Sequence, residues 1–231
     1  MQRVPEPELM DDQVQAEVYA AADFDEAHSR VVDGFDVCFP GAELRGCVLD
    51  LGCGPGDICF RLAARYPGCT VTGVDGSNAM IRLANRRRAD DAAGDRVTFV
   101  EGLIPGAPIP EVPYAAIVSN SLLHHLHRPE VLWQAIDTYA DTATRIYIAD
   151  LRRPQGTDEA RRLVGEYAAG EPDILQRDFY NSLLAAFTPQ EVEAQLAGAG
   201  LKDLSVDVIS DRHLVVHGTI NRDRQVKPAG R

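Results

Sequence analysis

The chain has 231 residues and a net charge of −12, with 45% hydrophobic and 25% charged residues. This length fits one large domain with a sizeable core. The acidic charge argues against a nucleic-acid partner, because proteins that grip a phosphate backbone usually present a basic face. No apolar run approaches the ~20 residues that cross a bilayer, and the polar N-terminus resembles neither a secretory signal nor a transit peptide.

The cysteines and the arginine runs add two expectations. The five cysteines are odd in number and include no CxxC pair, so we expect reduced thiols and a cytoplasmic location. Since no apolar run is long enough to cross a bilayer, we also expect no membrane partner. Residues 86–88 are three consecutive arginines, followed closely by acidic residues. We expect them to form the solvated end of a helix.

The predicted elements alternate along the middle of the chain. Residues 6–37 are expected to form an N-terminal helical cap. Strands are predicted at 47–51, 70–75, 96–102, 114–121 and 145–151, and helices at 57–66, 78–89 and about 129–140. Ser77 is a good N-cap for the second of these helices. Strands separated by helices of this length predict a parallel sheet with right-handed crossovers.

The C-terminal third departs from this alternation. Residues 152–187 contain two predicted helices, which we interpret as a lid insertion. Thr188, Pro189 and Glu191 form a capping box that begins another helix. Two strands around Ser210-Asp211 predict an antiparallel hairpin that closes the sheet. We therefore expect a single α/β domain over 1–221, with three layers and a mostly parallel sheet, and a disordered tail over 222–231.

Three glycines follow the first predicted strand, in the stretch "VLDLGCGPG" at 48–56. Ligands of open α/β sheets bind outside the carboxyl ends of the strands. Bare glycines let a ligand lie against the backbone, and the following helix offers free N–H groups. Asp75 ends the next strand, 75 − 52 = 23 positions after Gly52, close to the roughly 20 typical of an acid that binds ribose hydroxyls. The pattern predicts an adenosine-type site.

The spacing of the glycines also bears on the kind of ligand. The dinucleotide fingerprint is G-x-G-x-x-G/A, whereas here the third glycine comes one place early and Asp57 occupies the last position. A pyrophosphate would meet the Asp57 carboxylate, and Asp50 adds a second negative charge before the loop. A ligand with an ammonium group and a sulfonium matches these charges better.

Three segments resemble motifs of one enzyme family. "VLDLGCGPG", "VTGVDGSNAMIRLA" and "IVSNSLLHHL" are similar to the first, second and fourth motifs of class I S-adenosylmethionine-dependent methyltransferases, within residues 47–151. The resemblance implies a Rossmann-like methyltransferase sheet, S-adenosyl-L-methionine as cofactor, and in-line methyl transfer to a nitrogen, oxygen, sulfur or carbon atom of a small-molecule acceptor. An NAD(P)-dependent Rossmann oxidoreductase and a non-catalytic S-adenosylmethionine-binding protein remain as alternatives.

The same resemblance implies a set of cofactor-binding residues. The glycine loop would lie along the methionine portion, Asp75 would bind the ribose hydroxyls, and Met80 would pack near the adenine. Leu103 stands where related sequences usually carry an acid for the adenine amino group. The implied cofactor-binding residues are Tyr19, Asp50, Gly52, Cys53, Gly54, Asp75, Gly76, Ser77, Met80, Gly102, Leu103, Asn120, Ser121 and His125.

Two histidines are the candidates for catalysis. His124 and His125 follow the fourth strand and would lie beside the transferred methyl group, where either could act as a general base or only pack against the loop. His127 shares a turn with His124, but the spacing shows no third ligand, so no metal is expected.

The remaining candidates concern the acceptor. Asp150 either faces the pocket or caps the following turn, and Arg152 either binds a substrate carboxylate or is solvated together with Arg153. Neither the acceptor nor the oligomeric state follows from the sequence. The candidate substrate-binding residues are Asp150, Arg152, Tyr180, Asn181 and Arg212.

Overall fold

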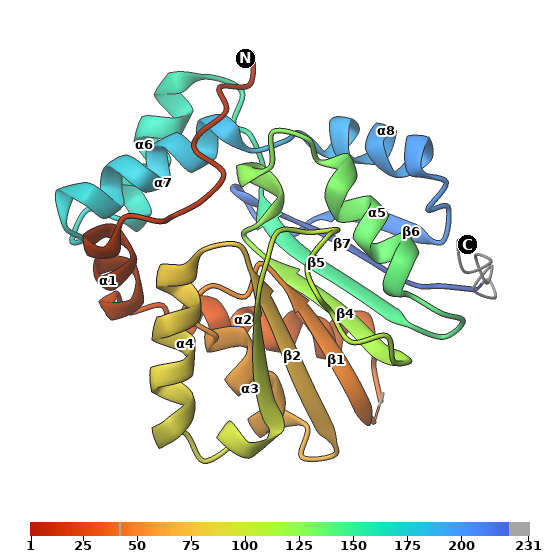
Figure 1. Ribbon diagram of the computed structural model, residues 1–231. Helices are drawn as coiled ribbons and strands as arrows, with labels where there is room; N and C mark the ends of the chain where they lie inside the picture. The colour runs from red at the N-terminus through yellow and green to blue at the C-terminus, as the bar shows by residue number, and fades with distance from the viewer. Residues whose placement is uncertain (42, 222–231) are drawn as a thin grey trace.

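The computed structural model describes residues 1–41 and 43–221, and its centre is a seven-stranded sheet in the order β3-β2-β1-β4-β5-β7-β6 (Figure 1). β1 to β5 run parallel, and β7 pairs antiparallel with both β5 and β6. This confirms the predicted mixed sheet with its C-terminal hairpin. The strands are β1 (Gly46–Leu51), β2 (Cys69–Asp75), β3 (Val97–Glu101), β4 (Tyr114–Asn120), β5 (Arg145–Leu151), β6 (Leu204–Val208) and β7 (His213–Thr219).

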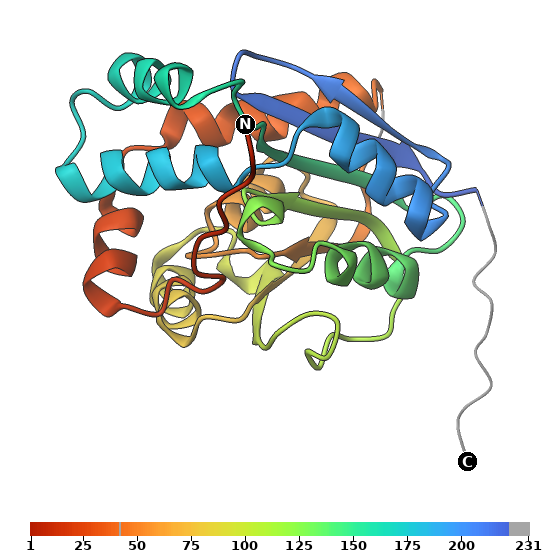
Figure 2. The ribbon, with the colours of Figure 1, turned by 90° about the horizontal axis from the view of Figure 1, so that it is seen from above.

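Successive residues of a strand point to opposite faces of the sheet. Apolar residues therefore lie on both faces here, and helices cover both. Val48 packs with α2 and α3 on one face, whereas its neighbour Leu49 packs with α5 and α8 on the other (Figure 2). The three-layer arrangement is as predicted. The helices are α1 (Gln13–Ala21), α2 (Asp25–Cys38), α3 (Asp57–Arg65), α4 (Asn78–Asp90), α5 (Glu130–Tyr139), α6 (Thr157–Tyr167), α7 (Asp173–Ala185) and α8 (Pro189–Ala199), with short 3₁₀ turns η1 (Gly94–Arg96) and η2 (Leu123–His125).

The predicted caps explain where two helices begin. The side chain of Ser77 accepts a hydrogen bond from the Met80 amide at the start of α4. Thr188 and Glu191 form the full capping box at the start of α8. Each cap satisfies amide groups that the first turn of a helix leaves without partners.

Three helices gather beyond one end of the sheet, at the upper left of Figure 1. α6 and α7 pack on each other around Leu163 and Leu183, together with Leu151 at the end of β5. α1 packs on α4 through Ala16, Ala79 and Met80. These additions place helices next to the carboxyl ends of the parallel strands, where ligands of such sheets bind.

The N-terminal residues correct one expectation. Residues 6–12 are not helical, and α1 begins only at Gln13, with Asp12 as its N-cap. Pro5 and Pro7 explain the difference, since proline disfavours a helical conformation of the residue before it. Residues 1–12, which we call the N-terminal strap, cross the carboxyl edge of the sheet (Figure 2). The Val4 amide donates to the carbonyl of Leu184, 3.0 Å away.

Two further expectations concern other parts of the chain. The predicted tail over 222–231 lies outside the described residues. Among the helices that the structure does describe, none combines the length and apolar character needed to cross a membrane. The cytoplasmic location stays a prediction.

Candidate active site

The three glycines of the glycine loop, residues 52–56, are required for different structural reasons. Gly52, Gly54 and Gly56 all have positive φ angles, of 72°, 52° and 85°, which side chains rarely tolerate. A Cβ on Gly52 would lie 2.8 Å from Leu122, and one on Gly56 would lie 2.6 Å from Phe99. A Cβ on Gly54 would meet no atom within 4 Å. Gly54 is therefore the point of the loop that can receive a ligand against bare backbone.

Asp75 fixes the geometry of this edge. Its carboxylate accepts hydrogen bonds from the Gly54 amide (2.9 Å) and from the Ser77 amide (2.8 Å). It thus ties the glycine loop to the start of α4, and each oxygen keeps a lone pair for a further donor. Burial raises the pKa of Asp75, while the two amides oppose the shift.

Leu103 lies beside Gly76, next to Asp75. A Cβ on Gly76 would approach Leu103 to 2.6 Å and Leu9 of the strap to 2.9 Å. Leu103 itself is 62% exposed, so its side chain presents an open apolar surface. Gly102 donates its amide to the carbonyl of Asp75 (2.9 Å).

Asp50 lies under the loop and is buried with only one bonded oxygen. The Cys59 thiol donates to Oδ2 at 3.1 Å, whereas Oδ1 is buried without a partner. Burial raises the pKa of Asp50 to about 7, with a further contribution from Asp75. At neutral pH this carboxyl carries only part of a negative charge, so the charge argument from Asp50 is weaker than the sequence indicated.

The contacts of Asp57 also weaken the expectation that free acids beside the loop would repel a pyrophosphate. Its carboxylate binds His28 Nδ1, Arg61 Nε and Arg87 Nη1, each at 2.6 Å. The charge is therefore neutralised by α2, α3 and α4 and is not free to oppose a pyrophosphate. Arg86, Arg87 and Arg88 are exposed near the end of α4, as expected, although Arg87 also stacks on the Phe60 ring.

Replacing Asp57 with asparagine is expected to lower the free energy of unfolding at pH 7 by about 2 kcal/mol. Burial alone would raise the pKa of Asp57, but its three partners outweigh burial and hold it well below the usual range. The contribution is therefore present above the unfolded pKa and is lost as the pH falls through the folded one. Urea unfolding measures it. Asp158→Asn, which removes an exposed pair with Arg161, should change stability by less than about 0.5 kcal/mol, and an equal effect of both variants would contradict the prediction.

Tyr19 reaches toward the glycine loop from α1. Its ring packs on Phe24, with centroids 4.9 Å apart. Burial raises its pKa to about 12, with the charges of Asp57 and Asp75 adding to the shift. Its hydroxyl is therefore neutral at physiological pH.

The histidine turn, residues 123–125, follows the end of β4. Ser121 has a φ of 57°, a conformation that is strained for a residue with a side chain. His124 is buried, and its Nδ1 donates to Asp150 Oδ1 at 2.6 Å. Although burial lowers the pKa of His124, the Asp150 carboxylate outweighs it and raises the pKa. Burial and the neighbouring His124 lower the pKa of His125 to about 3, so His125 is neutral at physiological pH.

The family model described as a methyltransferase domain matches residues 48–142. This stretch contains the glycine loop, Asp75 and the histidine turn, which follow the strands β1, β2 and β4. The central part of the chain is therefore similar to a methyltransferase domain.

Two curated proteins are similar to part of this chain. A trans-aconitate 2-methyltransferase of Delftia acidovorans is 32% identical over 168 residues, which cover 66% of this chain and 59% of that protein. A protein of the same name from Mycolicibacterium gilvum is 35% identical over 86 residues, covering 37% and 30%. The chain thus spans less than two thirds of the length of either relative.

Solved structures share its fold. The plantazolicin methyltransferase BpumL, in complex with a desmethylPZN analog and SAH, superposes with a TM-score of 0.66 at 16% identity, covering 91% of this chain and 90% of that one. A SAM-dependent methyltransferase from Aquifex aeolicus gives a TM-score of 0.64 at 16% identity, covering 90% and 98%.

The acidic and basic residues expected to bind the acceptor are bonded to other parts of the protein. Asp150 accepts from the amides of Leu123 and Leu151 as well as from His124, so it positions the histidine turn instead of facing a substrate. Arg152 donates Nε to the carbonyl of Ser210 (3.1 Å). Arg153 is buried and pairs with Glu191 at 2.6 Å, so the expectation that it is solvated is wrong.

The other three substrate candidates lie in two parts of the chain, with Arg212 before β7 and with Tyr180 and Asn181 next to each other on α7. Arg212 stacks on Tyr167, 3.3 Å from the ring centroid. Tyr180 packs against the α6–α7 cluster, and Asn181 is exposed on α7. Their roles as substrate-binding residues stay predictions.

The strap supplies two residues that the sequence did not single out. Arg3 donates Nη2 to the carbonyls of His124 (2.8 Å) and Leu126 (2.9 Å), and Glu6 lies against both histidines of the turn. Neither belongs to a recognisable motif. The pattern of two prolines among acids could have shown only that the segment is extended.

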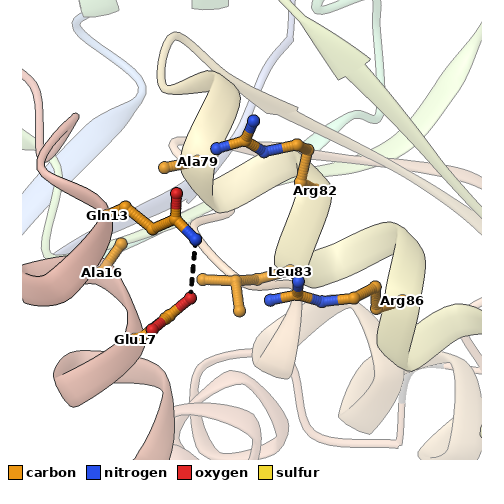
Figure 3. A pocket seen from close by; sticks show the side chains of 7 residues that line it. All are labelled: Gln13, Ala16, Glu17, Ala79, Arg82, Leu83 and Arg86. Atoms are coloured by element: carbon orange, nitrogen blue, oxygen red, sulfur yellow. Dashed lines mark hydrogen bonds between the residues drawn. The ribbon is translucent and has the colours of Figure 1, made fainter.

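Two hollows lie away from the glycine loop. One lies between α1 and α4, where Figure 3 shows Gln13 donating to Glu17 (2.9 Å) opposite Arg82 and Arg86. The other lies at the opposite end of the sheet, around Cys47 and Arg145. Neither hollow is lined by any of the expected cofactor-binding residues.

Proposed function

We propose that this protein transfers a methyl group from S-adenosyl-L-methionine to a small-molecule acceptor by in-line displacement. The observation that carries the proposal is the junction of Asp75 with the glycine loop, where an acid with free lone pairs stands beside the unobstructed Gly54. This junction lies at the carboxyl end of β1, between β2 and β4, where the strand order reverses. Ligands of open α/β sheets bind at such a point.

Each part of the cofactor has a matching surface in this proposal. The methionine portion lies along Gly52, Cys53 and Gly54, with Tyr19 covering it. The ribose hydroxyls donate to Asp75. The adenine lies against Leu103 and Gly76, whose apolar surface accounts for binding without the usual acid. The sulfonium comes next to Asn120 and Ser121, at the end of β4.

The acceptor would enter between the histidine turn and the α6–α7 lid. Holding the nucleophile in line with the methyl group supplies much of the acceleration in such reactions. Asp150 fixes the turn through hydrogen bonds from the Leu123 amide and from His124 Nδ1. His124 is buried and would hold the turn in place, whereas His125 keeps 23% of its side chain exposed. The part of His125 in catalysis would be to bind and orient the acceptor from this rigid support.

Incubation with labelled S-adenosylmethionine tests the proposal. Trans-aconitate, the compound in the name of the Delftia relative, and a pooled metabolite extract serve as acceptors, and products are identified by mass. We expect S-adenosylhomocysteine to bind calorimetrically and label to appear in a small molecule. Binding of NADH without binding of S-adenosylhomocysteine would overturn the assignment, and binding without any transfer would leave only a cofactor-binding protein.

A further inference from the structure

Glu6 of the N-terminal strap meets both histidines of the turn. Its Oε1 lies 3.5 Å from His124 Nε2 and 3.4 Å from His125 Nδ1. The three ligand atoms all lie within 4.8 Å of one another. Two imidazole nitrogens and one carboxylate oxygen therefore form one compact cluster.

These separations suit a shared ion. Zinc binds histidine nitrogen at about 2.0–2.1 Å and carboxylate oxygen at about 2.0–2.2 Å. Neighbouring ligand atoms of a tetrahedral ion are then roughly 3.3 Å apart. By contrast, hydrogen bonds of this kind are usually about 2.7–3.0 Å long, so the observed distances are too long for good direct bonds.

Two of the three atoms lack any hydrogen bond. Glu6 Oε1 and His125 Nδ1 are buried without a partner in the described part of the chain. Buried polar atoms almost always have partners, since leaving one without costs about 1–3 kcal/mol. An ion among them would supply the missing partner to both atoms at once.

The surroundings prepare the histidines as ligands. His124 donates Nδ1–H to Asp150 (2.6 Å), which leaves the Nε2 lone pair directed at Glu6. A carboxylate behind a metal-binding histidine is the usual arrangement that fixes its tautomer and orientation. Arg3 donates a hydrogen bond to the carbonyl of His124 and so anchors the strap to the turn. This contact of the strap holds Glu6 against the turn without a metal ion.

We propose that Glu6, His124 and His125 bind a divalent transition metal of the zinc class, with Asp150 as the carboxylate that orients His124. Three protein ligands leave one tetrahedral position open, as in catalytic zinc sites. Water or an acceptor oxygen would complete the coordination at that position. The sequence predicted no metal because the third ligand comes from the strap, far from the histidines along the chain.

Metal binding is measured on the untagged protein after treatment with a chelator. Zn²⁺ is titrated by calorimetry, and Co²⁺ is followed by its visible absorption as a probe of tetrahedral geometry. We expect one equivalent of either ion to bind, and the Co²⁺ complex to show tetrahedral bands. Glu6→Gln and His125→Asn should each weaken binding at least 100-fold while keeping the wild-type circular dichroism.

His217→Asn is the matched control. His217 forms a pair with Asp207 at 2.8 Å on the hairpin, with no second histidine in that pair, and its loss should leave binding unchanged. Absence of binding at one equivalent, or equal weakening in His217→Asn, would overturn the site and indicate instead that Glu6 is protonated and shares its proton with the histidines. The measurement needs no methyl transfer, so it can fail or succeed independently of the proposed function.

Discussion

Replacing Asp75 with asparagine is expected to weaken S-adenosylhomocysteine binding at least about 100-fold, since bonds to a charged group contribute about 1.5–3 kcal/mol each. The carboxylate accepts from the amides of Gly54 and Ser77. An asparagine would turn an NH₂ group toward one of these amides and so lose that bond. It would also leave the proposed ribose site with one acceptor oxygen instead of two. Isothermal calorimetry with S-adenosylhomocysteine measures the loss.

Asp95→Asn provides the comparison for this variant. Asp95 is exposed in η1, so its replacement removes the same charge without touching the loop. We expect wild-type affinity for Asp95→Asn and wild-type circular dichroism for both proteins. Unchanged affinity in Asp75→Asn would remove Asp75 from the cofactor site.

The sheet and its flanking helices could be predicted because their signals are local. Thr188 and Glu191 mark the start of α8 within four residues, and Ser77 marks the start of α4. Apolar strands recur from β1 to β5. The strap could not be predicted in this way. Its residues follow no period, and its position depends on contacts with residues far along the chain, such as Arg3 with the carbonyl of His124.

The same difference between local signals and long-range contacts applies to the candidate site. The glycine loop and Asp75 belong to one continuous motif, so their types and spacing alone predict their contact. The direction in which an acid points depends on partners from other helices. Asp57 is next to the loop in sequence, yet His28 of α2 and Arg87 of α4 hold its carboxylate. Asp150 likewise points toward the histidine turn. It accepts a hydrogen bond from the Leu123 amide in the turn and another from the amide of its own neighbour Leu151.

Asp50 gives the second large effect, in the dependence of stability on pH. Its folded pKa of about 7 exceeds the unfolded value of 3.8, so the folded state holds a proton that the unfolded state releases. Stability therefore falls as the pH rises between these two values and levels off above the folded one. At about 1.36 kcal/mol per pKa unit, the loss is about 4 kcal/mol. Asp50→Asn, which resembles the neutral acid, should escape it.

Urea unfolding between pH 4 and pH 8, followed by the fluorescence of the single buried Trp133, compares the two proteins. The variant should gain stability relative to the wild type as the pH rises, and be the more stable protein at pH 8. Asp90→Asn, which changes an exposed acid of α4, should follow the wild-type profile. A constant difference between Asp50→Asn and the wild type at every pH would show that Asp50 ionises normally. Its burial under the glycine loop would then be compensated by a donor to Oδ1.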